Sequence, residues 1–304
     1  MRVRSGRPGR CSGWRSLLHM QPFRDRLAAA AEAKRSVLCV GLDPRVELLP
    51  EDVWRGVRAG PAGSTRAVER FCEGILAAVA PHAVAVKPQL AFFEALGHNG
   101  LAALERLCAR ARELGLLVIA DAKRGDIGST AEAYAAAYLR GAPPLADALT
   151  VNPYLGLDSL EPFAAACREH GGSLFVLVRT SNPGGADLQE LELAAGGRLW
   201  EHVARLVDSL GAIAGAVVGA TQAGAIARAR ELMPQAVFLL PGIGAQGGEL
   251  AALAPAFVPG PAGGLVSASR SVLYADRDDW RAAAGAEAER LRAESWKLVP
   301  ERRP

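Results

Sequence analysis

The stretch "LGLLVIADAKRGDIGST", residues 114 to 130, contains the three parts of one βα unit. It begins with an apolar run, continues through two acids and two bases, and ends with hydroxyl residues that suit the start of a helix. Ser129 and Glu132 also have the spacing of a capping box. A short, nearly continuous apolar run is typical of a parallel strand covered on both faces. The stretch therefore predicts a buried strand, a charged strand end and a helix.

The same pattern recurs along the chain. Eight apolar runs are present, at residues 36–43, 83–87, 116–121, 147–152, 174–180, 215–221, 237–242 and 264–269. Between the runs the apolar spacing becomes helical, as at Val68, Phe71, Ile75 and Val79. Eight βα units without a second-domain linker favour a single (β/α)8 TIM barrel over a doubly wound sheet. We expect this barrel to occupy residues 20–304.

The net positive charge of the chain comes from its first 19 residues. The formal charge is +3, and removing the five arginines of the first 19 residues leaves −2, so we expect no binding of nucleic acid. Residues 1–19 are expected to form a basic, disordered leader or to precede the true start at Met20. A transit peptide is the alternative, because this segment bears Arg and Ser and lacks acids.

Composition and spacing argue against a membrane protein, a disulfide framework and a metal site. No apolar run approaches the 18 or more residues of a membrane span. The 5 cysteines are odd in number and widely spaced, which favours reduced thiols in the cytoplasm. The histidines show no HxH or HxxxH spacing and no CxxC occurs, so we expect no metal.

Polar and charged residues collect where the predicted strands end. They are Asp43, Lys87, Asp121, Asn152, Thr180, Thr221 or Gln222, Gly242 and Arg270. In a barrel, the carboxyl ends of the strands form the face that carries catalytic residues. Asp121 and Lys123 are two positions apart, so an extended strand would point both side chains into the barrel mouth. A solvated turn is the alternative, but further charges at Lys87, Asp43 and Asp126 argue against it.

The segment "PGIGAQGG", residues 241–248, has the glycine spacing of a dinucleotide-binding loop. The acid expected about 20 residues further on is missing, and no second mononucleotide-binding half follows. Its place after the seventh strand suits the phosphate-binding loop of a barrel instead. Arg270, after the eighth strand, would supply a charged donor to the same phosphate. A plain turn is the remaining alternative.

Several ordered motifs resemble those of the orotidine 5′-phosphate decarboxylase family, in its bacterial subfamily with DAKRGDIGxT. They are "VGLDP", "VKPQLAFFE", "DAKRGDIGST", "TVNPYLG", "RTSNPG", "PGIGAQGG" and "SASR", in strand order. The resemblance covers most of the chain from about Phe23. It implies cofactor-independent decarboxylation of orotidine 5′-monophosphate to uridine 5′-monophosphate, the last step of de novo pyrimidine biosynthesis, with no metal.

The resemblance also assigns residues. Lys87, Asp121, Lys123 and Asp126 correspond to the catalytic Lys-Asp-Lys-Asp array, in which Lys123 protonates a C6 carbanion. Asp126 and Thr130 would reach the neighbouring subunit's site, which implies a homodimer. The remaining substrate contacts are the ribose-binding acid Asp43, Ser181 beside the pyrimidine, and Gln246, Gly247 and Arg270 at the phosphate.

Two departures and two alternatives accompany this assignment. Gln89 stands where Asn is expected, and Ser269 stands where Gly is common, which could crowd the phosphate. Relatives such as keto-gulonate phosphate decarboxylase and hexulose phosphate synthase share the D-x-K-x-x-D strand but use Mg²⁺ and carry an acid instead of Lys87. A non-catalytic nucleotide-binding barrel is disfavoured because the charged array is intact. Arg124 receives no role and is expected to be solvated.

Overall fold

The computed structural model describes residues 21–220, 223–243 and 250–300. The predicted leader, residues 1–19, lies outside the described residues. No helix within the described ranges is both long and apolar enough to cross a membrane.

Eight parallel strands close into a barrel, in chain order, with β8 pairing to β1. Each predicted apolar run contains most or all of one strand. The strands are β1 (Leu38–Leu42), β2 (Ala85–Pro88), β3 (Leu117–Arg124), β4 (Ala148–Val151), β5 (Ser173–Arg179), β6 (Ala214–Val218), β7 (Phe238–Pro241) and β8 (Gly264–Ala268). The expectation of a (β/α)8 barrel is therefore confirmed.

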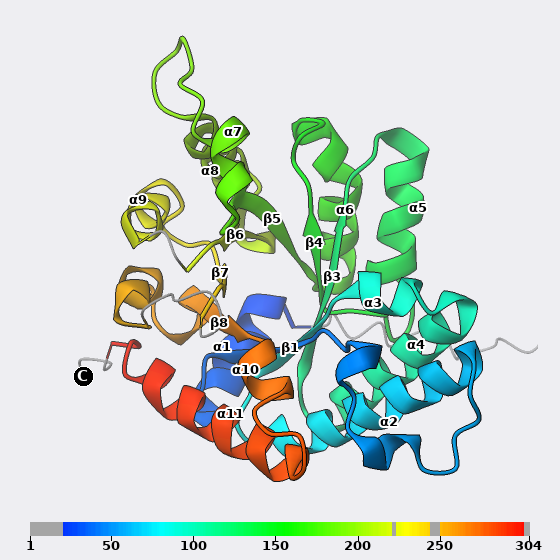
Figure 1. Ribbon diagram of the computed structural model, residues 1–304. Helices are drawn as coiled ribbons and strands as arrows, with labels where there is room; N and C mark the ends of the chain where they lie inside the picture. Colours follow the sequence, from blue (N-terminus) through cyan, green and yellow to red (C-terminus); the bar gives the residue numbers. More distant parts are fainter. Residues whose placement is uncertain (1–20, 221–222, 244–249, 301–304) are drawn as a thin grey trace, which may run out of the picture.

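Helices surround the barrel, and the strands occupy its centre (Figure 1). The helices are α1 (Phe23–Lys34), α2 (Pro61–Val79), α3 (Leu90–Glu94), α4 (Gly97–Glu113), α5 (Gly128–Leu139), α6 (Leu157–His170), α7 (Ala186–Gln189), α8 (Leu199–Ser209), α9 (Ala223–Leu232), α10 (Arg270–Leu273) and α11 (Trp280–Trp296). A 3₁₀ helix, η5 (Leu250–Phe257), lies between β7 and β8. Helix α1 packs on short turns that precede β6 and β8, so it covers the amino-terminal end of the barrel.

Burial explains why the runs form strands. Every residue of β1, β2, β4, β6 and β8 is buried, as expected for strands packed on both faces. Strand β3 departs from this pattern, because its last three residues leave the core. Cys39, Cys72, Cys108 and Cys167 are buried and unpaired, in agreement with the expectation of free thiols.

Candidate active site

The mouth of the barrel holds a buried ion pair between neighbouring strands. Lys87 in β2 places Nζ 2.5 Å from Oδ2 of Asp121 in β3. Both residues are only 6% exposed. A buried carboxylate and ammonium are costly unless they are paired, so each group requires the other. The structure therefore brings together two of the residues that the sequence placed at separate strand ends.

Lys123 joins this pair from the solvent side. Its Nζ lies 2.5 Å from Oδ1 of Asp121, so each oxygen of the carboxylate contacts one ammonium group. The Lys123 side chain is 46% exposed, whereas that of Lys87 is 7% exposed. Of the two lysines, Lys123 is therefore the one whose ammonium group is open to a ligand in the barrel mouth.

The two ammonium groups control the protonation of the cluster. Burial by itself would raise the pKa of Asp121, but Lys87 and Lys123 outweigh it and lower this pKa to about 2. Burial would likewise lower the pKa of Lys87, but Asp121 and Asp43 raise it above its ordinary value. At neutral pH the cluster thus contains an ionised Asp121 beside a charged Lys87.

Thr150 and Gln89 complete the hydrogen bonding of the cluster, although the sequence predicted a role for neither residue. The Thr150 hydroxyl donates to Oδ1 of Asp121 at 3.1 Å and accepts from the Lys123 backbone N–H at 2.9 Å. The Gln89 amide donates to Oδ2 of Asp121 at 3.2 Å. Thr150 could have been identified from the sequence because it is a hydroxyl residue within the apolar run "ALTV". Gln89, which departs from the Asn expected at its position, thus contacts the charged array directly.

Asp43 and Ser269 lie together where β1 and β8 end. Oδ1 of Asp43 is buried without a hydrogen-bond partner within the described part of the chain. The Ser269 side chain faces Gly41, where an added Cβ would lie 1.9 Å from Oγ of Ser269. Arg270 follows as the exposed first residue of α10. This side of the mouth thus contains the Asp43 carboxylate, whose Oδ1 can still accept a hydrogen bond, and the exposed Arg270.

Asp126 and Thr130 follow the cluster along the chain, in the turn after β3 and on α5. The Asp126 carboxylate accepts a hydrogen bond from the backbone N–H of Ile127 at 2.8 Å. Thr130 is exposed on α5. In the described part of the chain, neither residue forms a hydrogen bond or ion pair with Lys87, Asp121 or Lys123.

The loop after β5 carries Ser181, which is half-buried. Ser181 packs against Gly219, where an added Cβ would lie 2.9 Å from the Ser181 backbone. The base of the loop is fixed by Arg179, whose Nε lies 2.7 Å from Glu190. Beyond α7 the chain projects away from the barrel before it returns to α8 (Figure 1).

Two predicted phosphate ligands, Gln246 and Gly247, lie outside the described residues. Over the ranges that the structure describes, no group of three or more His, Cys, Asp or Glu side chains has an arrangement that could hold a metal ion.

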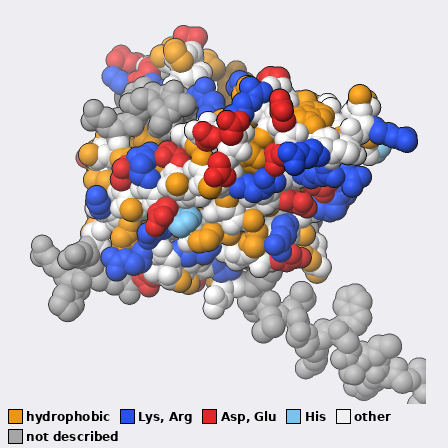
Figure 2. Space-filling view, turned by 60° about the horizontal axis from the view of Figure 1, so that its bottom comes forward, with side chains coloured by type: hydrophobic (Ala, Val, Ile, Leu, Met, Phe, Trp, Pro, Cys, Tyr) orange, Lys and Arg blue, Asp and Glu red, His pale blue; other side chains and the backbone are white. Residues whose placement is uncertain are grey.

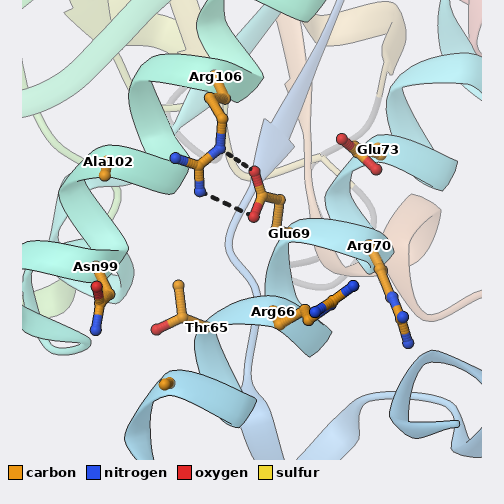
Figure 3. Close-up of a pocket in the computed structure, with 9 residues that line it drawn as sticks. Thr65, Arg66, Glu69, Arg70, Glu73, Asn99, Ala102 and Arg106 are labelled. Carbon is orange, nitrogen blue, oxygen red and sulfur yellow. Dashed lines mark hydrogen bonds and ion pairs between the residues drawn. The ribbon is translucent and has the colours of Figure 1, made fainter. Parts of the chain in front are cut away.

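A groove of about 470 Å³ lies outside the barrel mouth, between α2 and α4 (Figure 3). Arg66, Arg70 and Arg106 line it together with Glu69 and Glu73. Arg106 forms a bidentate ion pair with Glu69, at 2.5 and 3.0 Å. On the face that Figure 2 presents, basic and acidic side chains are also interspersed. This groove has no residue in common with the Asp121 cluster.

The fold and the cluster define a class of protein, namely (β/α)8-barrel enzymes with charged catalytic groups at the carboxyl ends of the strands. A family model described as "Orotidine 5'-phosphate decarboxylase / HUMPS family" matches residues 36–286. The chain is 49% identical to an orotidine 5′-phosphate decarboxylase from Deinococcus radiodurans, over 83% of this chain and 89% of that protein. It is 44% identical to one from Rhodopirellula baltica, over 85% and 90% of the two chains.

A solved structure agrees with these relatives. The OMP decarboxylase of Leishmania donovani is 37% identical, with a TM-score of 0.74 over 91% of this chain and 100% of that one. The chain belongs to the orotidine 5′-phosphate decarboxylase family. The resemblance inferred from the sequence motifs is thereby confirmed.

Proposed function

We propose that residues 20–304 form an enzyme domain that decarboxylates orotidine 5′-monophosphate to uridine 5′-monophosphate without a cofactor, in the last step of de novo pyrimidine biosynthesis. The observation that carries this proposal is the Lys87–Asp121–Lys123 cluster, in which one buried carboxylate lies 2.5 Å from each of two ammonium groups. Such a fixed array of charges suits a reaction whose main difficulty is a localised negative charge.

The reaction breaks the bond between C6 and the carboxylate, so CO₂ leaves and the electron pair stays on C6. No π system of the ring is aligned to accept this pair, so the site has to stabilise it electrostatically. Lys123 is the group open to the ligand, and it would stabilise the carbanion before donating its Nζ proton to C6. Lysine then regains a proton from water. Asp121 would also repel a substrate carboxylate placed beside it.

Asp43, Ser181 and Arg270 would provide further substrate contacts around the barrel mouth. Asp43 would accept a hydrogen bond from a ribose hydroxyl, because its buried Oδ1 has no hydrogen-bond partner among the described residues. Ser181 would lie beside the pyrimidine. Arg270 would bind the phosphate together with Gln246 and Gly247, and binding there would help to hold the array closed over the substrate.

A homodimer with shared sites is part of the proposal. Asp126 does not join the cluster of its own chain, and its neighbour Ile127 is 60% exposed. Tyr154 and Leu155, in the adjacent loop after β4, are 76% and 49% exposed. Exposed apolar side chains around a charged residue are typical of a protein interface. In such a dimer, Asp126 and Thr130 would complete the partner's site. The four buried free thiols support a reducing compartment such as the cytoplasm.

Lys87 distinguishes this proposal from the Mg²⁺-dependent sugar-phosphate members of the wider family. A buried ammonium group at the end of β2 would repel a cation at the position of Asp121. The purified chain is therefore expected to convert orotidine 5′-monophosphate in the presence of excess EDTA at the same rate as without it. The ultraviolet change on product formation measures this rate. A strict requirement for added Mg²⁺ would contradict the proposal.

A further inference from the structure

Strand β3 bulges between Ala120 and Arg124, in the segment that contributes Asp121 and Lys123 to the cluster. Its pairing with β4 is regular up to Ala120, opposite Leu149, and the next pair joins Arg124 to Val151. Residues 121–123 of β3 therefore lie opposite a single residue of β4, Thr150. Lys123, within this bulge, has φ of +49°, in the left-handed region that a lysine rarely adopts. A conformation of this kind persists only where surrounding contacts impose it.

Arg124 supplies contacts on the outer side of the bulge. It is half-buried rather than solvated, so the expectation from the sequence was wrong. Its Nη1 donates to the carbonyl of Ala122, inside the bulge, at 3.2 Å. Its Nη2 forms an ion pair with Glu94 of α3 and donates to the Tyr138 hydroxyl of α5 at 3.1 Å. The guanidinium thus connects the bulge to two helices.

Aromatic rings and backbone hydrogen bonds fix the rest of the bulge. The guanidinium carbon of Arg124 lies 5.4 Å and 5.7 Å from the ring centres of Tyr134 and Tyr138, within the range of cation–π contact. The Arg124 carbonyl accepts from the backbone N–H of Asn152 at 2.9 Å. Arg124 is therefore held outside the barrel, while Lys123 next to it is directed at Asp121.

We propose that Arg124 is a positioning residue that keeps Nζ of Lys123 at the reacting carbon, an inference that rests on the proposed function. The left-handed conformation is unfavourable for a residue other than glycine, because its Cβ comes too close to the following carbonyl oxygen. Without the Arg124 bond to Ala122, the backbone at Lys123 is free to relax toward an ordinary conformation and to move the ammonium group. A displacement of about 1 Å at a catalytic group can reduce the rate about 100-fold.

The test uses Arg124→Met, which keeps a long side chain and removes every donor. We expect kcat to fall about 10- to 100-fold, while KM and the Kd of uridine 5′-monophosphate change less than about 3-fold. The matched control is Arg168→Met, which removes an exposed arginine of α6 that pairs with Glu161. This control should keep the wild-type kcat and KM.

Glu94→Gln provides a second variant, because it weakens the anchor of Arg124 and keeps the shape of the side chain. It should also lower kcat with KM unchanged, by less than Arg124→Met does. An unchanged kcat in Glu94→Gln, or a raised KM with an unchanged kcat in either variant, would overturn the positioning role. If the wild-type chain itself does not decarboxylate the substrate, the proposed function fails instead, so the two failures are distinguishable.

Discussion

At the scale of single residues, Asp121 receives more contacts than any other member of the cluster. Lys87, Lys123, Thr150 and Gln89 all direct a donor at its two carboxylate oxygens. Hydrogen bonds and opposite charges both favour the ionised form of a carboxyl group. Protonation of Asp121 would therefore weaken the whole cluster, which makes the stability of the protein dependent on pH.

This dependence has a defined direction. The pKa of Asp121 is lowered from 3.8 to about 2 on folding, so its contribution to stability is complete above pH 3.8 and is lost as the pH falls through about 2. The contribution is about 2 kcal/mol. Urea unfolding at a series of pH values should show a steeper loss of stability between pH 4 and 2 in the wild type than in Asp121→Asn. Parallel curves for the two proteins would contradict this assignment of the pKa shift.

At the scale of elements, the contact between β1 and β8 leaves no room for a side chain at Gly41. A Cβ there would lie 1.9 Å from Oγ and 3.0 Å from Cβ of Ser269, and rotation of Ser269 relieves only the first contact. Gly41→Ala is therefore expected to destabilise the protein by about 1–3 kcal/mol, the usual cost of overpacking. Chemical denaturation measures this change. The double variant Gly41→Ala/Ser269→Gly should recover most of the loss, and no recovery would show that Ser269 is not the obstacle.

The elements also show what the sequence could and could not predict. The apolar runs located the strands, because burial on both faces requires continuous apolar residues. The capping box predicted at Ser129 and Glu132 was wrong, since α5 already begins at Gly128 and Ile127 precedes it without a side-chain cap. The strand ends indicated Lys87, Asp121 and Lys123 as site residues. The bulge and the anchoring of Arg124 could not be predicted, because they depend on the register between β3 and β4 and on side chains from α3 and α5.

At the scale of the whole molecule, the proposed sharing of sites predicts complementation between inactive variants. A site would contain Lys123 from one subunit and Asp126 from the other, so Lys123→Ala and Asp126→Ala should each be inactive alone. A hybrid dimer of the two variants contains one intact site. An equal mixture after subunit exchange should therefore regain about a quarter of the wild-type rate. Each variant mixed with itself is the control, and no recovery after demonstrated exchange would contradict a shared site.

The pairing of β8 with β1 has a consequence for how the protein is made. A ribosome releases β1 first and β8 among the last parts of the chain, so a nascent chain has an open sheet with two unpaired edges. Such edges can pair with other chains and cause aggregation. Asp43 and Ser269, at the ends of the first and last strands, come together only when the final strand is inserted. Protection from misassembly and completion of the proposed nucleotide site therefore depend on the same late step of synthesis.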